Sequence, residues 1–102
     1  MKKKQKYFQD VMMEELTDIG DTLIRKQIDY GSNAISRFGL EGILIRMSDK
    51  LERLIHLQQL KSDPEVDESI EDTLRDMAVD VILGRMVQSG HFPLPIKQKG
   101  QE

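Results

Sequence analysis

Acidic side chains recur at three- and four-residue spacing in two segments of the chain. Asp49 and Glu52 form the first pair. The second group consists of Glu68, Asp72, Asp76 and Asp80. Residues three or four positions apart are neighbours on a helix surface. Carboxylate oxygens are the ligands that Mg²⁺ prefers, and the ion keeps positions for phosphate oxygens. The pattern therefore indicates a magnesium site built by carboxylates on two facing helices.

These acidic residues have a second interpretation, which is a pair of solvent-exposed helix faces neutralised by Lys and Arg. At about 100° per residue, the acidic face of the later segment points away from its apolar face. The acidic face contains Asp72, Asp76 and Asp80, and the apolar face contains Leu74, Met77 and Val81. A metal site therefore requires the acidic faces of two helices to meet each other or a partner subunit.

Basic residues accompany the first acidic pair. Arg46, Lys50 and Arg53 lie along the same segment. Their charges suit contacts to phosphate oxygens, because hydrogen bonds between ionised groups are strong. The alternative is pairing within the helix, for example between Asp49 and Arg53. Both interpretations remain open at the level of the sequence.

Two ring side chains also have two interpretations each. Tyr30 could stack on a nucleotide base, or it could pack over the end of a helix. His56 lies one turn beyond Glu52 and could serve as a metal ligand or proton carrier. A lone exposed histidine more often has no such role, so the sequence assigns none to His56.

Three segments with the periodicity of amphipathic helices position these residues. We expect helices over about residues 7–28, 40–60 and 67–88. Their expected apolar faces contain Phe8, Val11, Met12, Leu16, Ile19, Leu23 and Ile24; Ile43, Leu44, Met47, Leu51, Leu54 and Ile55; and Ile70, Leu74, Met77, Ala78, Val81 and Ile82. Pro64 suits the start of the third helix, and Gly90 suits its end. No segment shows strand alternation, so we expect an all-α fold.

The organisation is that of one domain. A basic extension covers residues 1–6, a single helical domain covers residues 7–90, and a polar tail covers residues 91–102. The 102 residues are 38% hydrophobic, 5% aromatic and 32% charged. Such a short, charged chain buries a modest core, and association of copies adds buried area. We therefore expect an oligomeric helical bundle, as a homodimer or homotetramer.

Charge and hydropathy exclude several classes of protein. The net charge of −3 argues against duplex nucleic acid as the main partner, because proteins that bind it carry a basic face. No stretch approaches the ~20 apolar residues of a membrane span, so no membrane partner is expected. The chain has no cysteine, which excludes a disulfide framework and a thiolate metal site. These features favour a cytoplasmic location.

Three motifs in order resemble a known family. They are Lys26-x-x-Asp29-Tyr30-Gly31, the stretch Gly42–Leu51, and the stretch Asp67–Leu74 followed by Asp76. Together they span about residues 26–80 and are similar to the "nucleotide modification associated domain 1" proteins of phages and prophages. That family is in turn similar to the all-α nucleotide pyrophosphatases related to MazG and the dimeric dUTPases.

The resemblance implies a MazG-like helical oligomer around a carboxylate–magnesium site. Those enzymes cleave a nucleoside triphosphate to the monophosphate and pyrophosphate. Their signature is Glu-x-x-Glu on one helix and Glu-x-x-Asp on the next, and Asp49-x-x-Glu52 resembles the first half. The second half departs from the pattern, with Asp72 and Asp76 four positions apart as the candidates. These four residues are the implied catalytic and metal ligands for Mg²⁺ or Mn²⁺.

The same resemblance implies a nucleotide partner in the cytoplasm, which is the host cytoplasm for a phage-encoded protein. The expected substrate-binding residues are Lys26, Tyr30, Arg46, Lys50 and Arg53. The basic residues would neutralise the phosphates, and Tyr30 with Lys26 would lie near the base or phosphates.

Three functions follow from these observations. The first is a magnesium-dependent nucleotide pyrophosphatase, and the second is a protein that binds or sequesters a nucleotide without cleaving it. The third is a helical module for protein interaction, in which the charges only solvate the surface.

Overall fold

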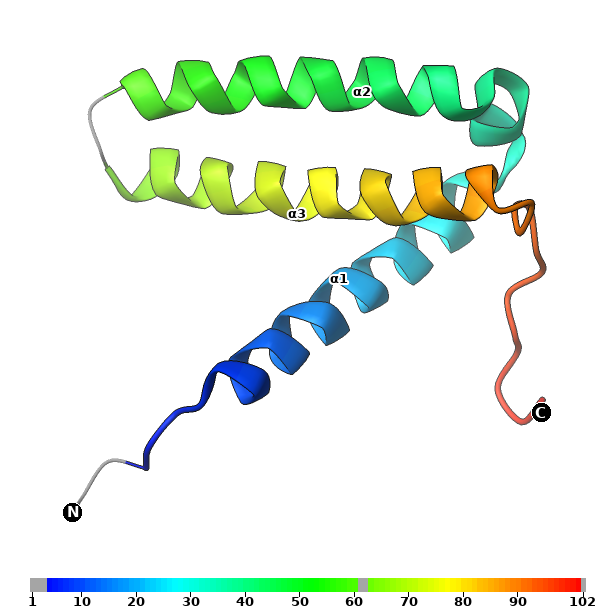
Figure 1. Cartoon of the computed structure of the whole chain (residues 1–102), viewed down its shortest axis with the longest axis horizontal. Helices are drawn as coiled ribbons and strands as arrows, with labels where there is room; N and C mark the ends of the chain where they lie inside the picture. Colours follow the sequence, from blue (N-terminus) through cyan, green and yellow to red (C-terminus); the bar gives the residue numbers. More distant parts are fainter. Residues whose placement is uncertain (1–3, 61–62, 102) are drawn as a thin grey trace.

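The computed structural model describes residues 4–60 and 63–101, and this part of the chain contains three helices and no strand. Helix α1 spans Phe8–Tyr30, α2 spans Asn33–Gln59 and α3 spans Pro64–Gln88. Helices α2 and α3 lie side by side as a long antiparallel hairpin, and α1 runs obliquely across it (Figure 1). The expected all-α class with three main helices is confirmed.

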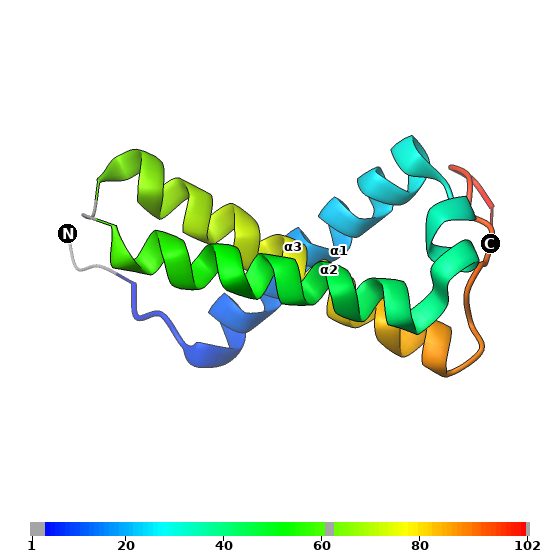
Figure 2. The ribbon, with the colours of Figure 1, turned by 90° about the horizontal axis from the view of Figure 1, so that it is seen from above.

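The contacts of α1 are uneven along its length. Its C-terminal half packs against α3, whereas its N-terminal half extends away from the hairpin (Figures 1 and 2). Residues 4–18 are all exposed, and burial begins at Ile19 and Gly20. One helix therefore both closes one side of the hairpin and projects beyond it.

Local chemistry explains where α3 begins and ends. The Asp63 side chain caps the helix, with its Oδ1 accepting from the Val66 N–H at 2.9 Å, and Pro64 occupies the first turn. Such capping satisfies a backbone donor that has no partner within the helix. Gly90 follows the helix with φ of 79°, and the His91 N–H donates to the Met86 carbonyl at 2.8 Å. The predicted roles of Pro64 and Gly90 are confirmed.

Helix α2 begins earlier than the expected start near residue 40. Residues Asn33–Phe38 already form a short helical piece, which Gly39 separates from the rest. Gly39 has φ of 61° and ψ of −150°, a conformation that glycine adopts without steric cost. The helix therefore turns sharply at this residue, as Figure 2 shows at the start of α2.

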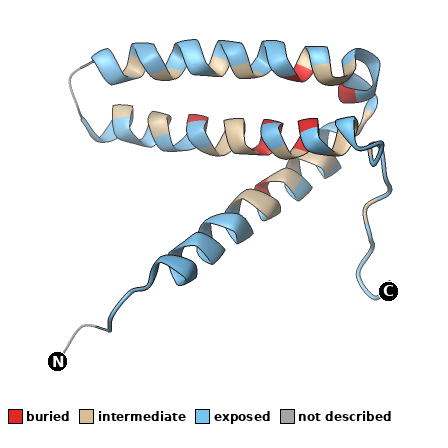
Figure 3. Cartoon of the chain, viewed as in Figure 1, coloured by how far each residue is buried: buried red, intermediate tan, exposed pale blue. Residues whose placement is uncertain are grey.

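The buried core is small and lies where the three helices meet (Figure 3). It consists of Ile35, Ile43, Val79 and Leu83. Partly buried Ile19, Leu23, Met47, Val87 and Phe92 pack against it.

The expected core face of α3 is wrong in detail. Leu74 and Val81 are exposed, whereas Thr73, Val79 and Leu83 are buried against the other helices. Gly84 is also buried on this face. A Cβ on Gly84 would lie 3.5 Å from Leu40 Cδ1, an ordinary van der Waals distance, so α3 faces Leu40 of α2 at this residue.

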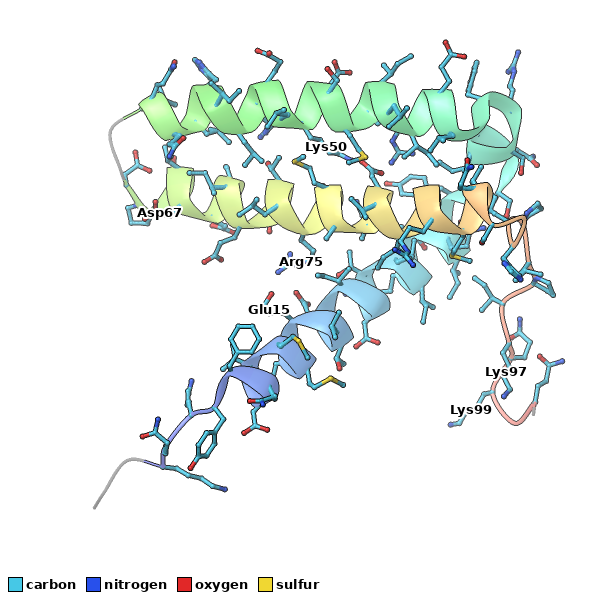
Figure 4. All side chains as sticks on the ribbon, in the orientation of Figure 1. Glu15, Lys50, Asp67, Arg75, Lys97 and Lys99 are labelled. Atoms are coloured by element: carbon cyan, nitrogen blue, oxygen red, sulfur yellow. The ribbon has the colours of Figure 1, made fainter. Side chains whose placement is uncertain are left out.

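Arg75 joins α1 to α3 at the edge of the core. Its Nε donates to Asp18 Oδ2 at 2.8 Å, and its Nη1 donates to Asp72 Oδ1 at 3.1 Å. The bond and charge of Asp18 raise the pKa of Arg75 above its ordinary value. Figure 4 shows this side chain pointing from α3 toward α1. As a solvent-exposed ion pair it adds little stability but marks the crossing point of the helices.

Within the described ranges, no helix combines the length and apolar character that crossing a membrane requires.

We expect the substitution Ile43→Ala to lower the free energy of unfolding by about 2–5 kcal/mol, because it removes buried methyl groups and leaves a cavity. Urea denaturation followed by circular dichroism measures this loss. The matched control is Ile45→Ala, since Ile45 lies on the same helix but is 59% exposed, against 1% for Ile43. Equal losses for the two variants would contradict the core described above.

Candidate functional site

A pocket of about 520 Å³ lies where the C-terminal end of α1 meets α2 and α3. Its apolar wall is formed by Leu23, Ile35, Val79 and Leu83. Its polar wall contains Lys26, Tyr30, Arg46, Asp49, Lys50 and Asp76. These polar residues come from all three helices, so only the folded chain brings them together.

The most buried polar side chain of the described structure is Asp80, with no exposed surface. Its Oδ2 lies 2.5 Å from Lys50 Nζ, and its Oδ1 lies 3.3 Å from Arg46 Nη2. Lys50 points from α2 toward α3 (Figure 4). A buried charge is stable only when it is paired. Asp80 therefore holds two cations of α2 at the pocket.

This burial rules out, for Asp80, the interpretation in which the acidic residues form a solvent-exposed helix face. Helix α3 is rotated so that Asp80 faces α2. The sequence carried one signal of this, because Asp80 is flanked by Val79, Val81 and Ile82. Its four-residue spacing from Asp76 hid that signal by placing it in an apparent acidic series.

A second ion pair lines the same pocket. Lys26 Nζ of α1 lies 2.7 Å from Asp76 Oδ1 of α3, and both side chains are about one-third exposed. The pair spans the α1–α3 contact at the level of the pocket. Lys26 and Asp76 are thus brought together, although they are far apart in sequence.

Asp49 completes the acidic lining. It shares with Lys50 and Asp76 both this pocket and an adjoining one of about 450 Å³, which Arg53 and Thr73 also line. No ion pair joins Asp49 to Arg46 or Arg53 within the described residues, and Arg46 pairs with Asp80 instead. The alternative of pairing within α2 is therefore absent from this part of the chain.

The predicted set divides into two groups. Asp49, Asp76, Lys26, Tyr30, Arg46, Lys50 and Arg53 line the two adjoining pockets. Glu52 is exposed on α2 and contributes to neither pocket. Asp72 is also exposed, and it accepts a hydrogen bond from Arg75. A single chain therefore brings together half of the expected ligand set.

The number and type of oxygen ligands in the pocket determine which metal ions it could bind. In residues 4–60 and 63–101 no cluster of three or more acidic or histidine side chains is arranged to hold a metal ion. Two carboxylates, Asp49 and Asp76, do line one pocket. Proteins commonly bind Mg²⁺ through one or two carboxylates together with substrate phosphates. The described residues therefore form no all-protein cage, and a metal ion here would need further oxygen ligands from a substrate or from water.

Charges in and under the pocket nearly balance. The cations are Lys26, Arg46 and Lys50, and the carboxylates are Asp49, Asp76 and Asp80. A bound phosphate must compete with these carboxylates for the cations. A metal ion that neutralises carboxylates and phosphates together would remove this competition.

The two ring residues lie at different places. Tyr30 is 81% exposed at the last residue of α1 and lines the pocket, so little of its ring packs over the helix end. His56 is exposed in the last turn of α2. Tyr30 is therefore placed where a ring could meet a ligand.

Comparison with known protein families, with curated proteins and with solved structures gives no match for this chain. The similarity to the nucleotide modification associated domain 1 family stays a prediction based on the motifs in residues 26–80.

Proposed function

We propose that the protein binds a nucleotide in the pocket between α1, α2 and α3, with magnesium, and hydrolyses it to a monophosphate and pyrophosphate. One observation carries the proposal. One pocket is lined by three basic residues that the sequence had indicated, Lys26, Arg46 and Lys50. Asp49 and Asp76 line the same pocket. An apolar wall and Tyr30 complete a site with a place for phosphates and a place for a base.

In this proposal the chain's own residues bind and orient the phosphates. Arg46 and Lys50, held by Asp80, neutralise charge that develops on the leaving pyrophosphate. Asp49 and Asp76 would hold the metal, which would supply a Lewis acid and a bound water of lowered pKa. The apolar wall excludes water from the base, and Tyr30 stacks on it.

We also propose that the protein functions as a homodimer or homotetramer. The core of one copy is small, and many large apolar side chains are exposed on all three helices. Extended exposed apolar surface typically marks an interaction site.

The first test is pyrophosphate release from a panel of canonical and modified nucleoside triphosphates with Mg²⁺. We expect turnover of at least one nucleotide, and we expect Asp49→Asn to reduce it by at least about tenfold, as loss of groups at metal sites does. Asp49 lines the pocket, so its carboxylate is needed there.

Glu52→Gln and Asp72→Asn are matched controls for that test, since both remove one exposed carboxylate outside the pocket. We expect near-normal turnover from both. No turnover of any nucleotide by the wild-type chain would contradict the hydrolase.

A second candidate function is nucleotide binding without cleavage. The ion pair between Lys26 and Asp76 favours it, because a lysine already engaged with Asp76 leaves that carboxylate less available to a metal. The two functions differ in what Asp76 does: it either holds the metal or restrains Lys26.

Asp76→Asn separates the two functions. If Asp76 restrains Lys26, the substitution frees a cation, and we expect nucleotide affinity in EDTA to rise several-fold by calorimetry. If Asp76 holds magnesium, we expect the substitution to lower nucleotide affinity in Mg²⁺. The measurement in EDTA then does not report the functional mode of binding. Asp72→Asn, which removes a carboxylate on the same helix, should change neither affinity.

Thermal unfolding tests both candidates against a protein-interaction module. A ligand at a hundred times its dissociation constant stabilises a fold by roughly 2.7 kcal/mol, which raises the melting temperature measurably. We expect this rise for at least one nucleotide. Unchanged melting with the whole panel, with and without Mg²⁺, would leave the interaction module as the function.

A further inference from the structure

The N-terminal half of α1, residues 8–18, is a helical arm whose side chains are all exposed. It projects from the hairpin in both ribbon views (Figures 1 and 2). Its large apolar side chains include Phe8 at 80% exposure, Met12 and Leu16. A helix of this length is marginal in isolation, and helices in proteins gain most of their stability from packing an apolar face.

The apolar face of the arm continues an established interface. At about 100° per residue, Phe8, Met12 and Leu16 lie on the same narrow stripe as Ile19 and Leu23. Ile19 and Leu23 pack against the core. The stripe that joins α1 to the hairpin therefore runs on, uncovered, along the whole arm.

Charge is segregated along the same segment. Lys2, Lys3, Lys4 and Lys6 precede α1 in the sequence, and no Lys or Arg occurs between Lys6 and Arg25. Between them lie Asp10, Glu14, Glu15, Asp18 and Asp21. Two such arms side by side in parallel would place like charges together, whereas an antiparallel pair would place the lysines of one beside the acidic part of the other.

We propose that two copies of this chain associate through their α1 arms, packed antiparallel about a two-fold axis near Met12. This register places Phe8 of one copy against Leu16 of the other, and Met12 against Met12. It also places Lys6 of each copy near the acidic end of its partner's arm, where Asp18 already pairs with Arg75 of its own chain and Glu14 and Glu15 lie one turn before it. The interface is self-complementary, as a two-fold dimer requires, and it is independent of the nucleotide pocket.

The first test is sedimentation equilibrium of the full chain and of Leu16→Glu. Leu16 is exposed within one copy, so the variant keeps its helical circular dichroism. The wild-type chain is expected to be dimeric, and the variant to raise the dimer dissociation constant by roughly 100-fold, because a two-fold interface contains the change twice.

The matched control is Leu51→Glu, since Leu51 of α2 has the same exposure of 51% as Leu16. It is expected to leave the arm-to-arm dimer intact. A wild-type chain that is monomeric at all concentrations, or a dimer that persists in Leu16→Glu, would overturn the proposal.

Single cysteines test the antiparallel register, because the chain has none of its own. Met12→Cys should form a disulfide-linked dimer on mild oxidation, since a residue near the two-fold axis faces its own copy. Phe8→Cys should not, because its copies lie about 12 Å apart along the pair by helix rise, beyond the reach of a disulfide. Cross-linking of Phe8→Cys but not Met12→Cys would overturn the antiparallel register.

Discussion

The pairing of buried Asp80 with Lys50 and Arg46 is the constraint on which the hairpin and its pocket depend. Taking a carboxylate fully out of water costs several kcal/mol unless its charge is matched. Both cations come from α2, one helical turn apart, and the carboxylate comes from α3. A slip of one helix along the other would leave this charge without partners, so the pair fixes the register of α2 against α3.

The apolar packing around this pair follows the same register. Val79 and Leu83 flank Asp80 on α3 and meet Ile35 and Ile43 of α2. Gly84 of α3 faces Leu40 and Ile43 of α2 in the same alignment. Helix α1 then closes the other side through Ile19 and Leu23, and its Lys26 reaches Asp76. The core and the pocket lining thus depend on one alignment of helices.

Sequence periodicity was sufficient to predict that the chain forms three helices. The recurrence of apolar side chains every three or four residues is a local property of the sequence. Gly90 also acted locally, and the end of α3 at Gln88 was predicted, whereas α3 begins at Pro64, three residues before the expected start near residue 67. The sequence did not predict which face of α3 is buried. Apolar residues occur on more than one face of this helix, and the buried face depends on the shape of α2. Thr73 and Gly84 are buried on this face although neither has a large apolar side chain.

The candidate site, like the fold, was predicted only in part from the sequence. Residues from the three motifs line one pocket, among them Lys26, Lys50 and Asp76. Spacing in the sequence alone could not show that Asp76 lines the pocket whereas Asp72 is exposed. The role of Asp80 needed the rotation of α3, which only tertiary packing sets.

The sharp turn at Gly39 has a mechanical consequence for the pocket. Ile35 and Ala34 line it from the short piece before this residue, whereas Arg46 and Lys50 line it from the long piece after it. The two walls are therefore joined at one residue, whose positive φ no side-chain-bearing residue adopts readily. Because Ile35 also belongs to the buried core with Ile43, Val79 and Leu83, the backbone angle at Gly39 sets the shape of the core and of the pocket wall together.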